Sequence, residues 1–142
     1  AMVIPSLINR ASSGERPLTV WGDGSPIRDF IYSDDVADGM IEVVKQGYNK
    51  PINLGSGSGV TIKEIATSIS EKMPDECQII WDTSKPSGDK MRIMNTKRAE
   101  SLGIKPKTSL DKGIESTIEW YKEHSSKNHD KYNAFKDEKY KK

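Results

Sequence analysis

The chain has 142 residues, of which 34% are hydrophobic and 30% charged, with a formal net charge of +1. This composition is typical of one globular domain, and so small a net charge does not favour a nucleic-acid-binding protein. No apolar run approaches the roughly 18 residues that a membrane span needs. The first residues lack a basic segment ahead of an apolar one, so we expect no signal peptide. Cys77 is the only cysteine, which excludes an internal disulfide and fits a reducing cytoplasm.

The first part of the chain is predicted to form a helix and two strands. Apolar residues at helical spacing predict a helix over residues 3–11. Residues 18–21 and 28–32 are predicted to be short strands on either side of a glycine-rich turn at residues 22–26.

A second helix is predicted to follow residue 32. Ser33 is expected to cap it, and Asp34 and Asp35 in the first turn suit the positive end of the helix dipole. A catalytic role for this acidic pair is the alternative, which we favour less. The buried face of the helix is expected to consist of apolar residues at helical spacing, namely Val36, Met40 and Val44, with Ala37 and Ile41 alongside.

A strand at residues 52–54 is predicted to run into a glycine-rich turn at residues 55–59. Thr61 and Glu64 then have the spacing of a capping box. They precede a helix whose apolar residues lie at i, i+3, i+4, i+7 and i+11 and which Pro74 ends.

The rest of the chain is predicted to contain shorter elements and one firm helix. Residues 78–81 are expected to form a strand, 91–94 an extended segment and 96–102 a short helix. A last helix is predicted from the spacing of Leu110, Ile114, Ile118 and Tyr121. Since helices and strands alternate, the fold class is α/β, and since the strands are few and short we expect part of a larger fold.

A polar tail is predicted after this domain, which we place at residues 1–124. Residues 125–142 contain six lysines against three acidic residues and few apolar ones. Such a composition is typical of a mobile terminus, and a basic contact segment is the alternative.

Three stretches in order carry a resemblance to a known family. They are VWGDGSPIRDFIYSDDV at residues 20–36, INLGSG at 52–57, and SKPSG at 84–88 followed by Arg92 and by residues 96–103. Together they resemble the extended short-chain dehydrogenases that act on nucleotide sugars, the NAD-dependent epimerase/dehydratase family, over residues 3–122. Within it, Trp21 and the Lys-Pro-x-Gly loop are most similar to the GDP-L-fucose synthase branch, whose members are NADP-dependent epimerase/reductases.

The resemblance implies a C-terminal, substrate-binding part of such an enzyme without its cofactor-binding half. It implies a small domain plus elements that normally complete a doubly wound (Rossmann) sheet. In that family the helix after Tyr32 and the strand at 52–54 pack on the cofactor-binding half, so we expect an exposed apolar face here and self-association through it. We expect NADP to bind only the other half, no catalytic residue in this chain, and no activity of the chain alone.

Five residues are candidates for binding a nucleoside diphosphate sugar. Arg28 and Arg92 occupy positions that contact the diphosphate in the resembling family, and guanidinium groups suit its paired oxygens. Val3 and Leu7, one helical turn apart, are candidates for one wall of a base slot that Trp21 covers. The alternatives are ordinary surface salt bridges for the arginines and core positions for the apolar residues. Trp81 and Trp120 are assigned to packing.

Other motifs are interpreted as unrelated to function. The turn at residues 55–59 departs from the dinucleotide fingerprint G-x-G-x-x-G because Val60 stands where glycine is required. Tyr132 and Lys136 match a Tyr-x-x-x-Lys pair but lie after the substrate motifs, whereas the family places them before. His124 and His129 suggest no metal site. The competing functions are another nucleotide-sugar epimerase or dehydratase and a non-catalytic binding module.

Overall fold

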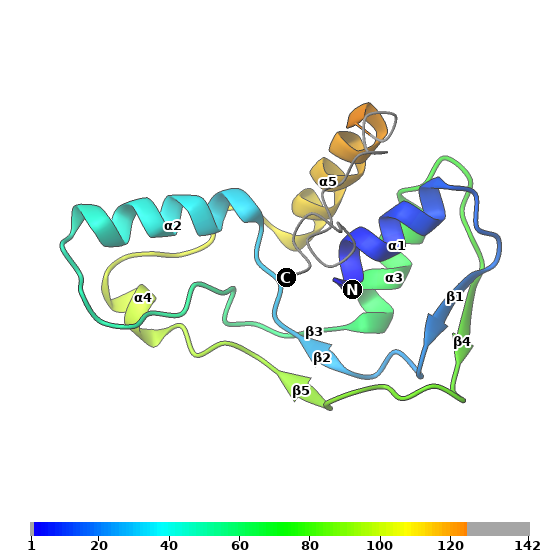
Figure 1. Cartoon of the computed structure of the whole chain (residues 1–142), viewed down its shortest axis with the longest axis horizontal. Coiled ribbons are helices and arrows are strands. Elements are labelled where there is room, and N and C mark those ends of the chain that lie inside the picture. Colours follow the sequence, from blue (N-terminus) through cyan, green and yellow to red (C-terminus); the bar gives the residue numbers. More distant parts are fainter. Residues whose placement is uncertain (1, 125–142) are drawn as a thin grey trace, which may run out of the picture.

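The computed structural model describes residues 2–124 and confirms the α/β class within them. The predicted tail, which includes Tyr132, Lys136 and His129, lies outside the described residues. The elements, labelled in Figure 1, are α1 (Val3–Ser12), β1 (Leu18–Trp21), β2 (Ile27–Arg28), α2 (Ser33–Lys45), β3 (Val60–Thr61), α3 (Ile62–Glu71), β4 (Ile79–Asp82), β5 (Met91–Arg92), α4 (Lys97–Ser101) and α5 (Leu110–His124).

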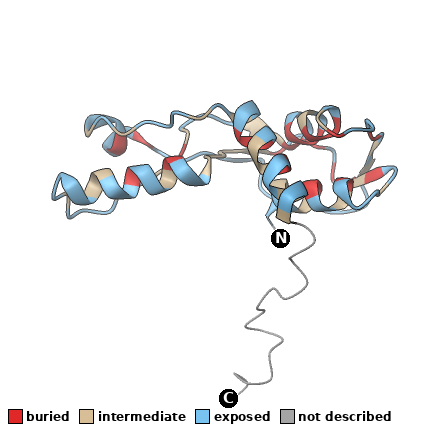
Figure 2. Cartoon of the chain, turned by 90° about the horizontal axis from the view of Figure 1, so that it is seen from above, coloured by how far each residue is buried: buried red, intermediate tan, exposed pale blue. Residues whose placement is uncertain are grey.

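The hydrophobic core lies between α1, α3, α5 and β1, at one end of the molecule (Figure 2). Each helix contributes the apolar face that its spacing predicts, because residues three and four apart lie on one side of a helix. The side chains with almost no exposed surface are Ile8, Leu18, Ile65, Ile69 and Ile114.

The predicted capping box at the start of α3 is confirmed. The Thr61 hydroxyl accepts the Glu64 N–H at 3.1 Å, and the Glu64 carboxylate accepts the Thr61 N–H at 2.7 Å. Both bonds satisfy backbone donors that a helix start leaves free. The cap therefore fixes where β3 ends and the buried face of α3 begins.

Two small sheets are joined by two chain segments that run side by side. β1 pairs with β4 in parallel, and a second sheet has the order β3-β2-β5, in which β2 pairs antiparallel with β3 and parallel with β5. Residues 22–26 connect β1 to β2, and residues 83–90 connect β4 to β5 (Figure 1). We call these two connections, residues 22–26 and 83–90, the crossing segments. The Gly22 N–H donates to the Asp82 carbonyl at 2.9 Å, so the two crossing segments begin side by side.

Two strand predictions were too long or wrong. β2 ends at Arg28 rather than at residue 32, and residues 52–54 are not a strand. A strand needs a hydrogen-bonded neighbour, and within residues 2–124 the 52–54 segment pairs with none. Conversely, β3 was not predicted, because its two residues form a strand only by pairing with β2.

The predicted buried face of α2 is wrong for this chain. Met40, Ile41 and Val44 are 59%, 53% and 79% exposed. Ala37 is also exposed and Val36 is half-buried. The apolar stripe is exposed to solvent. This agrees with the second expectation for this helix, that its apolar face is left uncovered without a cofactor-binding half.

The opposite side of α2 makes its contacts through a glycine and an acid. A Cβ at Gly39 would lie only 3.1 Å from a Leu54 methyl group and 3.3 Å from Ile104, so the missing side chain lets the helix approach both. Ser33 does not cap the helix: Tyr32 is the N-cap residue, and no side chain accepts a hydrogen bond there.

Asp35 anchors α2 to the segment before α5. Its side chain is buried, and its carboxylate accepts the N–H groups of Lys107 at 3.1 Å and Thr108 at 3.0 Å. Burial raises the pKa of this carboxyl, but the two N–H donors lower it more, so the net shift is downward. Asp35 therefore acts structurally in this fold, whereas Asp34 is exposed.

The two tryptophans assigned to packing differ. Trp81 packs against the core, and its ring lies 2.6 Å from where a Cβ at Gly24 would stand, which confirms the assignment. Trp120 is 51% exposed and stacks on His124 with 4.7 Å between ring centroids, so it packs on its own helix and not in the core.

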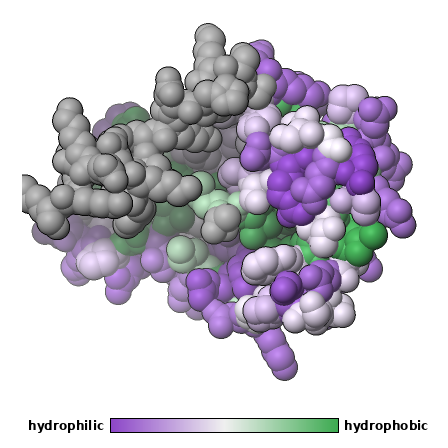
Figure 3. Space-filling model, turned by 45° about the vertical axis from the view of Figure 1, so that its right-hand side comes forward, coloured by the Kyte–Doolittle hydropathy of each residue, from purple (hydrophilic) through white to green (hydrophobic). Residues whose placement is uncertain are grey.

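The surface seen with the β1 and β4 side turned forward is mainly polar, with a narrow apolar strip (Figure 3). Within residues 2–124, no helix combines the length and apolar character needed to cross a lipid bilayer.

We predict that Asp35→Asn lowers the free energy of unfolding near pH 7 and that the difference from the parent chain shrinks in acid. The folded-state pKa of Asp35 is depressed, so its contribution is complete above the unfolded value of about 3.9 and is lost as pH falls through the folded value. Urea unfolding at pH 3 to 7 measures this. Asp34→Asn, at the exposed neighbour, is the matched control, and a difference independent of pH would contradict the prediction.

Candidate functional site

The two candidate arginines are direct neighbours across a strand pair. Arg28 of β2 is in register with Arg92 of β5, and partners in register project from the same face of adjacent strands about 4.8 Å apart. An Nη1 group of Arg28 donates to the Asp89 carbonyl at 2.8 Å, and Nη2 of Arg92 donates to the Asp89 carboxylate at 2.5 Å. Both guanidinium groups therefore meet at one residue.

Trp21 lies where the first crossing segment begins. Its side chain is 65% exposed, and the ammonium group of Lys85 lies 5.9 Å from its ring centroid. Lys85 and Asp89 belong to one short loop, so a single segment contacts both the tryptophan and the arginines. A Cβ at Gly22 would lie 2.6 Å from the Ser87 hydroxyl, so only glycine lets the loop pack this closely.

Two other acids of the crossing segments stabilise turns. Asp23 accepts the Ser25 N–H at 3.0 Å and the Ser25 hydroxyl at 2.7 Å. Asp82 accepts the Ser84 hydroxyl at 2.5 Å and the Ser84 N–H at 3.1 Å. These hydrogen bonds lower the pKa of both carboxyls, so the acids stay ionised while serving the turns.

Of the candidates for the base slot, Leu7 lies in the core with 4% of its surface exposed, and Val3 is half-buried against that core. For Leu7 the alternative, a core position, is the one the structure supports. The assignment of Val3 to a base slot stays a prediction.

The Asp29 carboxylate occupies the glycine-rich turn at residues 55–57. It accepts the N–H groups of Ser56 and Gly57 at 2.8 and 3.0 Å, the Ser56 hydroxyl at 2.5 Å and the Met94 N–H at 3.1 Å. Consecutive N–H groups of this kind form an anion-binding nest. Here the protein's own carboxylate fills it, so this turn does not suit a dinucleotide pyrophosphate, in agreement with its interpretation as a plain turn.

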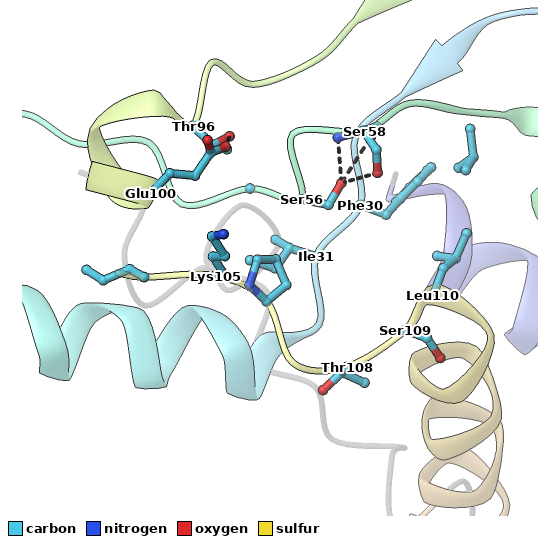
Figure 4. Close-up of a pocket in the computed structure, with 14 residues that line it drawn as sticks. Phe30, Ile31, Ser56, Ser58, Thr96, Glu100, Lys105, Thr108, Ser109 and Leu110 are labelled. Atoms are coloured by element: carbon cyan, nitrogen blue, oxygen red, sulfur yellow. Dashed lines mark hydrogen bonds between the residues drawn. The ribbon is translucent and has the colours of Figure 1, made fainter. Parts of the chain in front are cut away.

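A separate hollow of about 460 Å³ is lined in part by this turn (Figure 4). Phe30 and Ile31 line it, followed by Ser56 and Ser58 from the glycine-rich turn and Ser109 at the start of α5. Thr96, the N-cap residue of α4, and Glu100 within that helix also line it and are hydrogen-bonded to each other. None of the five predicted binding residues lines this hollow, so it is distinct from the arginine pair.

The metal-ligating side chains of residues 2–124 do not form a cluster. No group of three or more His, Cys, Asp or Glu residues there is placed to hold a metal ion. The donors of the glycine-rich turn are already used by Asp29. The expectation that NADP binds outside this chain stays a prediction.

The similarity of this chain to known proteins indicates its family. Residues 1–55 match the family described as "NAD dependent epimerase/dehydratase family". The probable GDP-L-fucose synthase 1 of Oryza sativa subsp. japonica is 38% identical over 126 residues, or 85% of this chain. The chain belongs to the NAD-dependent epimerase/dehydratase family. Its similarity to the GDP-L-fucose synthases agrees with the branch that the sequence motifs favour.

Solved structures of this family share the fold. A GDP-L-fucose synthetase from Naegleria fowleri superposes with a TM-score of 0.81 over 89% of this chain, at 23% identity. The UDP-glucose 4-epimerase of Thermotoga maritima, solved with UDP-glucose, gives 0.75 over 88% at 26% identity. This chain covers 41% and 40% of those two chains, and 38% of the rice relative. It thus spans about two fifths of its relatives.

Sequence reasoning missed the acids that organise the site. Asp29 and Asp89 stand beside the candidate arginines in the sequence, but nothing in their spacing indicates what their carboxylates contact. Asp29 reaches residues 27, 28 and 65 positions away, and only the fold brings these together.

Proposed function

We propose that this chain is the nucleotide-sugar-binding part of an NADP-dependent sugar-nucleotide epimerase/reductase of the GDP-L-fucose synthase type, which acts on GDP-4-keto-6-deoxy-mannose. The observation that carries the proposal is the register pair Arg28–Arg92 beside the exposed Trp21. The curated relatives named GDP-L-fucose synthase support the branch. The substrate of this chain is inferred from them.

The arginine pair suits a diphosphate. A nucleoside diphosphate carries two adjacent phosphoryl groups, and each guanidinium can donate two parallel hydrogen bonds to one of them. Strand pairing sets the spacing of the two side chains, so little entropy is lost on binding. Trp21 supplies an exposed aromatic surface next to the pair, which suits stacking against a flat base or covering the sugar.

The catalytic residues and the NADP site are assigned to a segment outside this chain. The nearest support is the Naegleria fowleri enzyme, which was solved bound to NADP and is more than twice as long as the part that this chain matches. The exposed stripe of α2 gives such a segment an apolar surface to cover. In its absence, the same stripe favours self-association.

We place the protein in the cytoplasm.

Two alternatives differ in specificity or in activity. A UDP-sugar or dTDP-sugar enzyme of the same family is supported by the Thermotoga maritima epimerase with UDP-glucose. A non-catalytic nucleotide-sugar-binding module is the second alternative, and the register pair Arg28–Arg92 beside the exposed Trp21 would serve it equally well.

We predict that GDP quenches or enhances the tryptophan emission of the chain, with weaker effects of UDP and dTDP. Trp21→Phe should abolish the response, since Trp21 is the tryptophan beside the site. Arg28→Ala and Arg92→Ala should each weaken binding by about 1.5–3 kcal/mol, the range for a hydrogen bond to a charged group. Fluorescence titration in a Trp120→Phe background, which removes the signal of the exposed Trp120, measures this.

Arg98→Ala is the matched control for these variants. Arg98 donates to the Pro51 carbonyl at 2.8 Å, away from the crossing segments, so its loss should leave nucleotide binding unchanged. Equal weakening by all three alanine variants would indicate a general charge effect and contradict the assigned site. Stronger binding of UDP or dTDP than of GDP would favour the first alternative.

We predict that the purified 142-residue chain does not oxidise NADPH in the presence of GDP-4-keto-6-deoxy-mannose, because no residue assigned to hydride or proton transfer lies in it. The same assay on a longer protein that adds a dinucleotide-binding segment upstream should show activity that Arg28→Ala reduces. NADPH oxidation by the 142-residue chain, measured by the loss of absorbance at the nicotinamide band, would contradict the assignment of the catalytic residues and the NADP site to a segment outside this chain.

A further inference from the structure

Asp89 places a negative charge inside the positive site. Its carboxylate pairs with Arg92, and its carbonyl accepts a hydrogen bond from Arg28. The side chains of Arg92 and Asp89 are 75% and 63% exposed, so water screens this pair and it contributes little to the stability of the fold. Breaking the pair therefore costs the fold little, so an incoming anion can compete with Asp89 for Arg92.

The position of the pair defines that role. Arg28 and Arg92 are adjacent like charges on neighbouring strands, and they repel each other when no anion lies between them. Asp89 offsets this repulsion in the ligand-free protein. A bound diphosphate supplies the same negative charge, and it needs the Arg92 donors that Asp89 holds.

We propose that Asp89 is an internal counter-ion that occupies Arg92 until a diphosphate displaces it, which rests on the proposed nucleotide-sugar site. The backbone carbonyl of Asp89 keeps its hydrogen bond to Arg28 in either state, so Arg28 stays oriented. A ligand with one phosphoryl group is satisfied at Arg28 and does not need Arg92. Asp89 is thus a specificity-determining residue that sets how much an incoming anion gains from its second phosphoryl group.

The loop that carries Asp89 is built for such an exchange. Gly88 precedes it with a φ of +76°, a backbone conformation that glycine adopts without strain. A Cβ at Gly88 would lie 3.4 Å from an Nη atom of Arg28, so the loop passes close to the guanidinium group. Asp82 fixes the start of the loop through Ser84, and the Asp89 carbonyl fixes its end at Arg28. The exchange therefore needs only a rotation of the Asp89 side chain.

The first test needs no nucleotide. Phenylglyoxal reacts with guanidinium groups that are not held in ion pairs, and peptide mass spectrometry reports the rate at each arginine. Asp89→Asn should increase the modification rate of Arg92 several-fold and leave Arg98 unchanged. An unchanged rate at Arg92 would overturn the proposal, whatever the outcome for nucleotide binding.

The second test uses the two ligands that the proposal separates. By calorimetric titration of the full chain, Asp89→Asn should tighten GDP binding about threefold, within the range for an exposed ion pair, and tighten GMP binding less. Asp89→Glu, which keeps the charge, should restore the parent affinities. Weaker GDP binding in Asp89→Asn, or an equal gain for both nucleotides, would overturn the proposal.

The two tests separate this proposal from the function on which it rests. If the parent chain and every variant fail to bind GDP, the proposed site is wrong. If GDP binds through Arg28 and Arg92 but Asp89→Asn leaves both the phenylglyoxal rate and the affinity unchanged, only the counter-ion is wrong. Circular dichroism of the exposed Asp89 variants confirms that each is folded before titration.

Discussion

One carboxylate, that of Asp29, holds together the part of the fold on which the candidate site depends. It ties the end of β2 to the glycine-rich turn and to Met94, just beyond β5. Hydrogen bonds from several N–H groups to one ionised carboxylate are stronger than neutral ones. Because Arg28 precedes Asp29 and Arg92 lies two residues before Met94, the same contact keeps the two arginines in register.

The acidic and basic residues around the site have different roles: four aspartates stabilise turns and loops, and two arginines are candidates for binding an anion. Asp29, Asp35, Asp23 and Asp82 each accept N–H groups of a turn or loop of the chain. The two arginines are held by the exposed Asp89 and by the Ile27 carbonyl, and within residues 2–124 their one ion pair is that between Arg92 and Asp89. A site for a diphosphate needs this balance, since cations buried in strong ion pairs bind an incoming anion poorly.

The fold is asymmetric in how well it is packed. The end formed by α1, α3, α5 and β1 has a continuous core, whereas α2 exposes its apolar stripe and residues 52–54 have no strand partner among the described residues. Sequence alone predicted the helices of the core end, because their periodicity reports burial by neighbours within the chain. It misjudged α2 because periodicity shows that a face is apolar but not what covers it.

The site was predictable in the same uneven way. Trp21, Arg28 and Arg92 followed from a motif resemblance, and the strand register places the arginines side by side. Leu7 could not be told from a core residue, since an apolar residue on a helix suits either role. The contacts of Asp29 with Met94 and of the Asp89 carbonyl with Arg28 join segments 65 and 61 residues apart, which no local pattern encodes.

The most direct measurement is the exchange rate of single backbone amides in Asp29→Asn, followed by NMR. An asparagine in this nest turns an NH2 group toward N–H donors, so at least one of them loses its acceptor whichever way the amide lies. The account predicts faster exchange at Ser56, Gly57 and Met94, weaker GDP binding, and no such change in Asp23→Asn. Unchanged exchange at these three amides together with unchanged binding would contradict it.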